Sequence, residues 1–350
     1  MMNITPIRRR ILRILDGRIK TYQEMSEKHW ILCPSESSTS PPAIYLDKEL
    51  QKVTAVLKET SYDLEMERIG GVRREHAATI AYSIRDVQIL DGYVYKGAMK
   101  HALVTTKEPL FGQSVTDYLP KAALACTWCG NRYFGHWMTD DITLNLAAQQ
   151  LAEAITSAKK PYSHEPEYRR LFGIQARTVT RVKCGELIII NDFGQNRFKR
   201  ERYEFLRDRL RLLEPVQKSH GIMIRRGGKL GVQRVLTNEA EIEQFLETQG
   251  FTIIDPEGLS ATEIVRQALD AKVVVGIEGS HIVHGLFSMA DSGTLCILQP
   301  PYRFNNVFKD YTDCLGMRYA FVVGKSVPNG FMIELEDLAR TLNRIQTLIA

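Results

Sequence analysis

The sequence has no run of 18 apolar residues that could cross a bilayer, and residues 1–17 have neither the apolar core nor the cleavage site of a secretory signal. Six cysteines in 350 residues are too sparse for a disulfide-stabilised secreted fold. The formal net charge is only +5 and is spread along the chain, which argues against nucleic acid as the main partner. These absences predict a cytoplasmic protein that can accommodate a small anionic substrate.

The sequence also lacks complete motifs for a metal site or a nicotinamide-cofactor site. Cys126 and Cys129 form a single CxxC pair without a second pair, and His136 alone is a poor candidate for completing a zinc site. A dinucleotide fold requires GxGxxG, but Glu278 stands where the second glycine belongs. We therefore expect no metal and no cofactor, and we interpret the two cysteines as small side chains near a pocket.

The length, with 44% hydrophobic and 25% charged residues, indicates an ordinary globular chain of two domains. Short apolar runs alternate with helical patterns in the second half, which predicts a parallel sheet with helices on both faces. Capping boxes at Asn238 with Glu241 and at Ser260 with Glu263 indicate two of the helices. The expected strands are Leu187–Asn191, Gly221–Ile224, Phe251–Ile254, Lys272–Val275, Thr294–Leu298 and Tyr319–Val323.

These patterns divide the chain into four parts. Residues 1–155 form a smaller N-terminal α/β domain, with a hairpin at Asp91-Gly92, and residues 156–184 form a polar linker. Residues 185–330 form the C-terminal parallel α/β domain. Residues 331–350 form a last helix that could pack back on the first domain.

The clearest local pattern is KVVVGIEGSHIVHGLF, in which an apolar strand turns through two glycines into a helix. Glycine lets backbone N–H groups approach a ligand, and the positive end of a helix favours phosphate. A tight turn without a ligand explains the glycines equally well. The candidate binding residues of this turn are Gly276, Glu278, Gly279, Ser280 and His281.

A second strand ends in GIMIRRGGKLGVQR, which places Arg225 and Arg226 at a carboxyl end, with Lys229 and Arg234 following. The planar guanidinium group binds phosphate in a bidentate manner, and ligands of parallel sheets collect at this edge. The pattern favours a diphosphate site over a solvated basic loop.

In the first domain, His136 and Asp140 lie four residues apart in a helical pattern beside Trp137. Such a pair lies on one helix face and can remove a proton from a hydroxyl, by the carboxylate alone or through the imidazole. The alternative is an N-terminal helical turn in which Asp140 only favours the helix dipole.

Together these segments resemble glycosyltransferase family 61. Its Asn-Tyr-His-Trp-x-x-Asp-like signature falls on Asn131, Tyr133, His136, Trp137 and Asp140. The arginine-rich strand end matches at Arg225, Arg226, Arg234, Asn238 and Glu239, and the glycine turn at Gly276, Gly279, Leu286 and Phe287. The closing segment matches at Pro300, Asn305, Tyr311, Gly316 and Tyr319. Glu278 departs from the family, which commonly has histidine there, and His281 stands in place of a small residue.

The resemblance implies two Rossmann-like domains facing a cleft (the GT-B type) and inverting, metal-independent transfer from a nucleotide-sugar donor. It implies a saccharide or lipid-linked acceptor, and a role in cell-surface or capsular polysaccharide synthesis. Asp140, with or without His136, is the expected base, and the arginines and glycine turn are the expected diphosphate site, with Asn131, Tyr133, Trp137 and Asn305 as further substrate-binding residues. A non-catalytic partner protein, suggested by Glu278, and a nucleotide-sugar epimerase are the alternatives.

The first 18 residues are basic and amphipathic, with Ile11, Leu12, Ile14 and Leu15 among arginines. Such a segment can rest on an anionic membrane surface at the inner face of the membrane, or it can be an ordinary helix that covers a core. Peripheral membrane association is therefore one of two interpretations of this segment.

Overall fold

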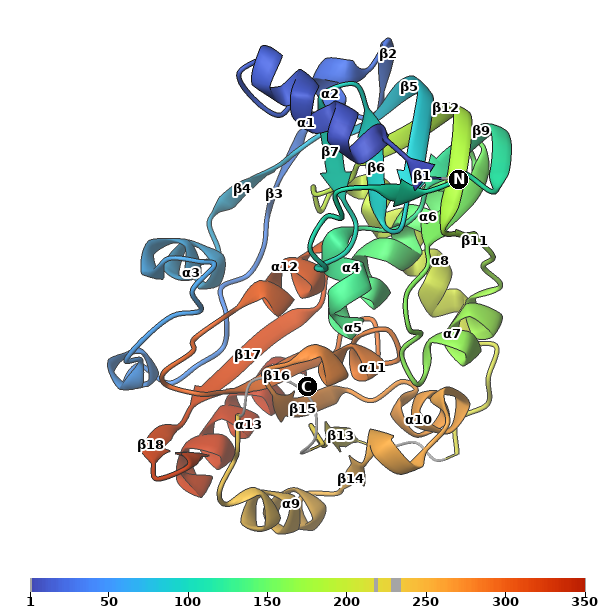
Figure 1. Ribbon diagram of the computed structural model, residues 1–350. Helices are drawn as coiled ribbons and strands as arrows, with labels where there is room; N and C mark the ends of the chain where they lie inside the picture. Colours follow the sequence, from blue (N-terminus) through green and yellow to red (C-terminus); the bar gives the residue numbers. More distant parts are fainter. Residues whose placement is uncertain (1, 217–219, 228–233, 350) are drawn as a thin grey trace. The chain divides into compact units, whose positions relative to one another are not determined.

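The computed structural model describes residues 2–216, 220–227 and 234–349 (Figure 1). It divides the chain into two compact units. Unit 1 comprises residues 1–36 and 76–202, and unit 2 comprises residues 37–75 and 203–350. The chain therefore passes between the units three times, and the third passage lies within helix α8 (Arg197–Leu210). Among the described residues, no helix combines the length and apolar character needed to span a bilayer.

Unit 1 is built on a mixed sheet with the strand order β11-β10-β9-β12-β5-β6-β7, and β2 also pairs with β5. The neighbours β11, β10, β9 and β12 are parallel, whereas β12, β5, β6 and β7 pair antiparallel. The strands are β2 (Lys28–Cys33), β5 (Thr79–Leu90), β6 (Tyr93–Lys96), β7 (Met99–Ala102), β9 (Asp117–Leu124), β10 (Glu153–Ser157), β11 (Arg177–Val179) and β12 (Arg181–Asn191).

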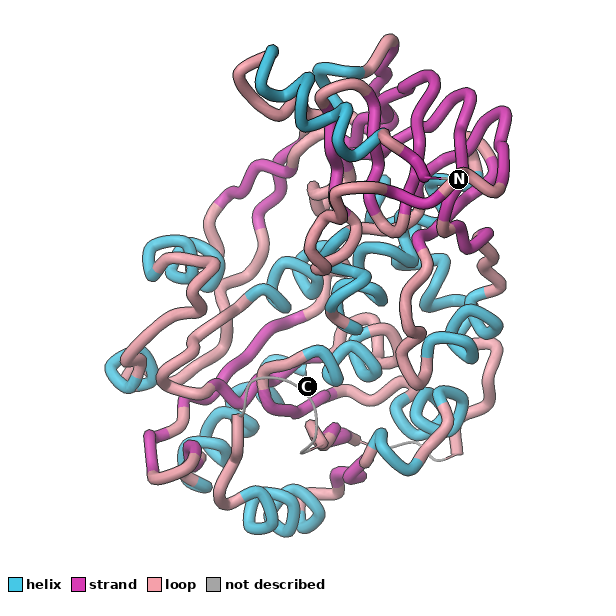
Figure 2. Tube along the Cα trace, viewed as in Figure 1, coloured by secondary structure: helices cyan, strands magenta, loops and turns pink. Residues whose placement is uncertain are grey.

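Helices and two short strands complete unit 1 (Figure 2). A segmented helix connects β9 to β10 and consists of α4 (Trp128–Arg132), α5 (Phe134–His136), the π-helix η2 (Trp137–Asp141) and α6 (Ile142–Gln149). The other elements are β1 (Met2–Asn3), which pairs with β8 (Gly112–Gln113), and the helices α1 (Thr5–Leu15), α2 (Tyr22–Met25) and α7 (Glu165–Phe172).

Unit 2 contains a sheet whose described strand pairs are all parallel, in the order β14-β13-β15-β16-β17. Its elements are β13 (Gly221–Ile224), α9 (Glu239–Thr248), β14 (Phe251–Ile254), η3 (Pro256–Gly258), α10 (Ala261–Ala268), β15 (Val273–Ile277), η4 (Ser280–Ile282), α11 (Val283–Leu286), β16 (Thr294–Gln299), α12 (Val307–Cys314), β17 (Arg318–Val323), β18 (Lys325–Val327), β19 (Gly330–Met332) and α13 (Leu335–Ile349). The inserted residues add η1 (Glu49–Lys52) and α3 (Tyr62–Ile69), between the paired strands β3 (Glu36–Thr39) and β4 (Arg73–His76).

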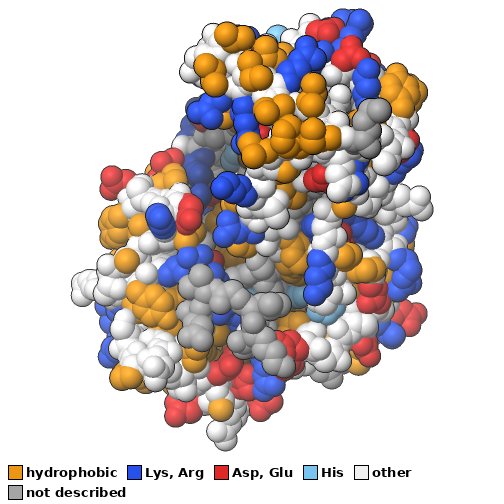
Figure 3. Space-filling view, in the orientation of Figure 1, with side chains coloured by type: hydrophobic (Ala, Val, Ile, Leu, Met, Phe, Trp, Pro, Cys, Tyr) orange, Lys and Arg blue, Asp and Glu red, His pale blue; other side chains and the backbone are white. Residues whose placement is uncertain are grey.

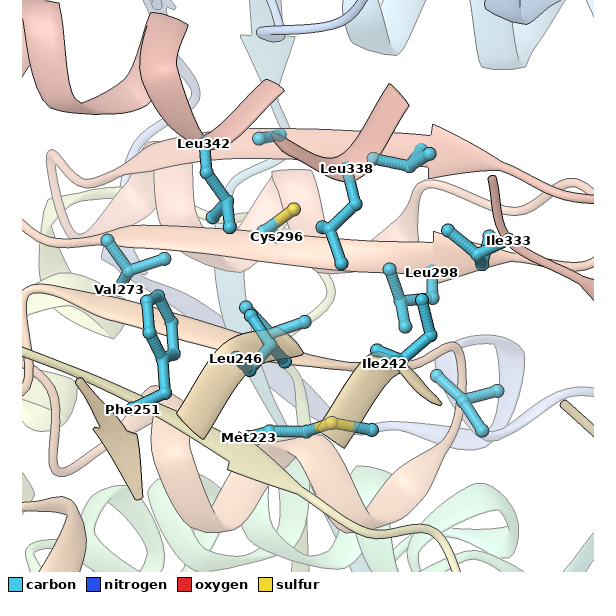
Figure 4. Packing of buried hydrophobic residues seen from close by; sticks show 14 of the residues in the cluster. Met223, Ile242, Leu246, Phe251, Val273, Cys296, Leu298, Ile333, Leu338 and Leu342 are labelled. Carbon is cyan, nitrogen blue, oxygen red and sulfur yellow. The ribbon is translucent and has the colours of Figure 1, made fainter. Parts of the chain in front are cut away.

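Apolar residues fix this arrangement because β13, β15 and β16 are buried along their whole length, and β17 at all but its first residue. Leu246 of α9 and Leu338 and Leu342 of α13 pack with Val273 and Cys296 of the sheet in one apolar cluster (Figure 4). On the other face, a β-carbon on Gly285 of α11 would lie 2.6 Å from Cγ1 of Val274, so this helix approaches the sheet closely. The predicted parallel sheet with helices on both faces is confirmed for unit 2.

Several boundaries differ from the sequence prediction. Leu187–Asn191, expected to open the C-terminal domain, lies in β12 of unit 1, because ten residues of this strand pair with β5. The predicted linker at 156–184 contains the end of β10, α7, β11 and the start of β12. The last helix packs on the sheet of unit 2, since Leu338, Leu342 and Ile345 belong to its core. It also binds residues of the predicted N-terminal range, because Asp337 pairs with Lys48 and Lys52, which belong to the segment inserted into unit 2. The two Rossmann-like domains that the resemblance implies would each have a parallel sheet; the sheet of unit 2 is parallel, whereas the sheet of unit 1 is mixed.

Local signals near these elements had mixed outcomes. The hairpin is confirmed: Asp91 and Gly92 both have positive φ, as a two-residue turn between β5 and β6 requires. The capping box of Ser260 and Glu263 is also confirmed. The one predicted at Asn238 is wrong, because the Asn238 amide exchanges hydrogen bonds with the backbone of Ile333 instead of capping α9.

Candidate functional site

The sheet order of unit 2 determines where a ligand can bind. The chain leaves β13 for β14 on one side and then returns past β13 to β15, so the connections diverge between β13 and β15. Open parallel sheets bind ligands outside the carboxyl ends of the strands at such a switch point. Arg225 and Arg226 follow the end of β13, and Glu278 and Gly279 follow the end of β15. Two of the predicted segments therefore meet at the switch point.

A cluster of arginines surrounds the Glu278 carboxylate at this point. Glu278 is 4% exposed, and its Oε2 lies 2.8 Å from Nη1 of Arg234 and 3.5 Å from Nε of Arg303. Arg234 also donates to the Glu278 carbonyl at 2.5 Å. Asn305 donates to Oε1 at 3.0 Å and so fixes the orientation of the carboxylate. We call Arg226, Arg234, Arg303 and Glu278 the arginine cluster.

The electrostatics of the cluster indicate an excess of positive charge. Burial lowers the pKa of Arg234 to about 10, opposed by Glu278 and assisted by the charges of Arg303 and Arg226. Burial and Arg303 likewise lower the pKa of Arg226, against the attraction of Glu278. Three guanidinium groups thus surround the Glu278 carboxylate, and Nε of Arg234 and Nε of Arg303 have no hydrogen-bond acceptor among the described residues. An anion with several oxygen atoms would satisfy these donors and relieve the repulsion.

His281 lies beside the same cluster and is neutral. Burial and the charges of Arg226 and Arg234 lower the pKa of His281 to about 3. Its Nε2 is buried without a hydrogen-bond partner among the described residues. A β-carbon on Gly279 would lie 2.9 Å from Nη1 of Arg234 and 3.2 Å from Nε of Arg226, so a side chain there would displace the arginines.

The other predicted binding residues of unit 2 have different surroundings. Arg225 pairs with Glu243 at 2.5 Å and lies 3.6 Å from Asp255, so the structure separates it from Arg226. Gly276 is closely packed, because a β-carbon there would lie 2.4 Å from Cδ1 of Ile282 and would displace that side chain. Lys229 lies outside the described residues.

The helix expected after the glycine turn is present but short. Ser280 and His281 begin the three-residue 3-10 helix η4, and α11 adds only four residues. A helix of this length contributes little macrodipole, so the positive charge at the switch point comes from arginine side chains.

The predicted contact between His136 and Asp140 in unit 1 forms as their spacing leads us to expect. Nδ1 of His136 lies 2.7 Å from Oδ2 of Asp140, and the two side chains are 37% and 25% exposed. Residues 137–141 adopt a π-helix, a local widening that is frequent at functional sites. It begins directly after His136, so the pair lies at the junction of two helix types.

A buried lysine holds this pair in place. Lys199 of α8 is 1% exposed, and its Nζ lies 3.3 Å from Oδ1 of Asp140 and 2.8 Å from the carbonyl oxygen of Asp192. Asp192 is in turn bound by both terminal nitrogens of Arg202 at 2.9 Å. Burial would raise the pKa of Asp140, but Lys199 and the hydrogen bond with His136 outweigh it, and the pKa is lowered.

The direction of the hydrogen bond within the pair follows from the charge of Asp140. An ionised Asp140 can only accept a hydrogen bond, so Nδ1 of His136 donates and Nε2 is left as the basic nitrogen. A carboxylate with a lowered pKa is a weak base, whereas a neutral imidazole oriented by a carboxylate can accept a proton. The geometry therefore favours His136 as proton acceptor and Asp140 as the residue that positions it.

The remaining signature residues of unit 1 lie on two sides of the helix. Tyr133 is exposed next to His136, with ring centroids 6.0 Å apart. Trp137 and Asn131 instead line a pocket of about 210 Å³ on the buried side, together with Cys126, Asp141 and Ser157. Cys126 and Cys129 are free thiols, and no group of residues in the described part of the chain could hold a metal ion.

Sequence reasoning missed Lys199, Asp192 and Arg303. Asp192 directly follows the buried strand β12, and Lys199 and Arg202 lie one helical turn apart on α8. This is the same type of signal, charge at the end of an apolar strand, that singled out Arg225 and Arg226. Arg303 follows β16, the neighbour of β15, in the closing segment.

Unit 2 thus belongs to the class of parallel α/β folds, and its switch point carries a cluster of arginine side chains. In comparisons with known families, the model of the family described as Glycosyltransferase 61 matches residues 134–297, just under half of the chain. The match includes His136, Asp140, Arg226, Arg234 and Glu278 and ends before Arg303. The search of curated proteins found no match. The family match supports the resemblance seen in the sequence.

Proposed function

We propose that the protein is a glycosyltransferase of family 61 that transfers a sugar from a nucleotide-sugar donor to a hydroxyl of a saccharide or lipid-linked acceptor. The observation that supports this most strongly is the arginine cluster at the switch point of unit 2. Its three guanidinium groups, with donors that find no acceptor in the described part of the chain, suit the diphosphate of such a donor.

The proposed reaction is inversion at the anomeric carbon without a metal. The bond between the anomeric carbon and the diphosphate oxygen breaks as the acceptor oxygen forms its bond to that carbon. Arg226, Arg234 and Arg303 stabilise the negative charge that develops on the leaving diphosphate. Nε2 of His136 accepts the proton of the acceptor hydroxyl, and Asp140, held by Lys199, stabilises the imidazolium that results.

In the proposed site Glu278 has a structural role. It departs from the family residue and on that account suggested a partner protein without catalysis. Its carboxylate is bound by Arg234 and Asn305 and lies near Arg303, so it organises the guanidinium groups that bind the donor. The site keeps its surplus positive charge with Glu278 in place. We further propose that the product belongs to a cell-surface or capsular polysaccharide.

The proposal is tested by thermal unfolding with uridine, uridine monophosphate and uridine diphosphate, and with the corresponding guanosine series. A ligand bound only by the native state raises the melting temperature, so the diphosphates should stabilise the protein more than the monophosphates or nucleosides of the same base. Arg234→Ala should remove this difference, and Arg340→Ala, a change on the exposed side of α13, should keep it. Equal effects of nucleoside and diphosphate in both series would contradict the proposal.

A further inference from the structure

The N-terminal helix of unit 1 is oriented with its apolar face toward solvent. Arg9 is 2% exposed and forms an ion pair with Glu108 at 2.6 Å. Ile11, Ile14 and Leu15 of the same helix are 54%, 79% and 76% exposed. At about 3.6 residues per turn, these three side chains and Ile4 fall within an arc of roughly 100°. The helix is therefore amphipathic but does not use its apolar face to cover the core. This excludes the interpretation of the segment as an ordinary core-covering helix.

Neighbouring segments extend this face into a larger apolar surface. β1 pairs with β8, which places Asn3 opposite Gly112, so that Ile4 directly follows one of the paired strands and Phe111 directly precedes the other. Arg10 donates to the carbonyl oxygens of Glu108 and Pro109, both at 3.2 Å, so the loop before β8 runs along α1. Figure 3 shows hydrophobic side chains gathered over this part of the molecule with lysine and arginine among them. We call the exposed residues Met2, Ile4, Ile11, Ile14, Leu15, Leu110 and Phe111 the N-terminal apolar surface.

The charges around the N-terminal apolar surface are mainly positive. The first 20 residues contain five arginines and one lysine but only one acidic residue, Asp16, which pairs with Lys20 at 3.0 Å. Glu108 is paired with Arg9, and Glu24 with Arg18. Arg8 and Arg13 are exposed on α1 itself. The surface thus presents apolar side chains with a surrounding excess of positive charge.

We propose that the N-terminal apolar surface attaches the protein to the surface of an anionic lipid bilayer. Helices with exposed apolar side chains and flanking arginines lie in the interface between headgroups and acyl chains, and each nearby cation adds attraction to anionic lipids. A second copy of the chain would bring two positively charged surfaces together, so the charge favours lipid. The proposal rests on α1 and its neighbours and is independent of the glycosyltransferase assignment.

The test is co-sedimentation of the full chain with vesicles of phosphatidylcholine alone and with vesicles containing about one third phosphatidylglycerol. The protein should bind the anionic vesicles and bind the neutral ones much more weakly. The triple variant Ile11→Ser, Ile14→Ser and Leu15→Ser should bind anionic vesicles at least about tenfold more weakly, because it removes the inserted apolar side chains. The double variant Arg8→Gln and Arg13→Gln should weaken binding by about fivefold for each charge removed.

The matched control replaces exposed apolar residues of unit 2, Leu212→Ser, Val216→Ser and Leu348→Ser, and should bind like the unaltered protein. Circular dichroism of each variant checks that it folds, and light scattering gives the oligomeric state. Absence of binding to anionic vesicles, equal loss in the control variant, or a dimer that the α1 triple variant converts to a monomer would overturn the proposal. The last result would show that a second copy of the chain, rather than a lipid bilayer, covers the N-terminal apolar surface.

Discussion

Replacing Glu278 by glutamine tests the account of the arginine cluster, because the change removes a charge and preserves the shape of the side chain. Glutamine can still accept the hydrogen bond of Asn305, now at 3.0 Å, but Arg234 and Arg303 lose the negative charge that lies 2.8 Å and 3.5 Å from them. Removing one partner of a buried ion pair costs about 3 kcal/mol, the lower end of the usual range, because Arg303 is partly exposed.

This loss should be visible as a lower melting temperature. For a unit of this size, about 3 kcal/mol corresponds to a decrease of roughly 6–12 °C. Pyrophosphate at about 100 times its dissociation constant contributes about 2.7 kcal/mol, so it should restore most of the lost stability. Glu278→Gln should also bind pyrophosphate more tightly than the unaltered protein, since the site carries one more positive charge.

Circular dichroism at increasing temperature and calorimetry with pyrophosphate are the assays. The matched control is Glu243→Gln, which removes the partner of the more exposed Arg225 and should cost at most about 1 kcal/mol. If Glu278→Gln destabilises the protein no more than Glu243→Gln does, or if pyrophosphate fails to stabilise it, the reasoning about the cluster is refuted.

Further predictions concern the arginines of unit 2, the His136–Asp140 pair and the residues next to that pair. Arg234→Ala should weaken binding of a nucleoside diphosphate by at least tenfold more than Arg225→Ala, about 1.4 kcal/mol, because Glu243 holds Arg225; calorimetry with both variants checks this. Asp140→Ala should reduce transfer by about a hundredfold or more with donor binding unchanged, and normal turnover would exclude its role. Lys199→Met should raise the pKa of Asp140, because the lysine charge lowers it; an NMR titration of the carboxyl group in both proteins checks this, and an unchanged pKa would argue against the coupling. Burial raises the pKa of Asp141 well above its ordinary value, so the native state loses stability as pH rises from about 3.9 toward that raised pKa. The variant Asp141→Asn should not show this loss. Measured by urea unfolding, the free energy of unfolding of the variant minus that of the unaltered protein should therefore increase with pH. No such increase would mean that Asp141 is ionised in the native state.

The sequence predicted most accurately what local patterns determine. The strands Gly221–Ile224 and Phe251–Ile254 coincide with β13 and β14, because apolar runs bounded by turn residues have few alternatives in a buried parallel sheet. The i, i+4 spacing of His136 and Asp140 predicted their contact, since helix geometry alone brings such residues together.

Contacts between distant segments could not be predicted in this way. Leu187–Ile190 has the same apolar character in either unit, and only its pairing with β5, about 100 residues earlier, assigns it to unit 1. Adjacent arginines in the sequence gave no indication that Arg226 would join Glu278 and that Arg225 would turn to Glu243. Lys199 reaches Asp140 across 59 residues, and Arg303 reaches Glu278 only because β15 and β16 are neighbours.

The most direct test of the central claim is release of nucleoside diphosphate from a panel of nucleotide sugars, followed by phosphorus NMR with the purified protein and saccharide acceptors. The account predicts that at least one donor gives a nucleoside diphosphate and a glycosylated acceptor of inverted configuration. It predicts that Arg234→Ala and His136→Ala each abolish this release, the first with loss of donor binding and the second without it. Release that continues in both variants, or conversion of the donor to an isomeric nucleotide sugar without an acceptor, would contradict it.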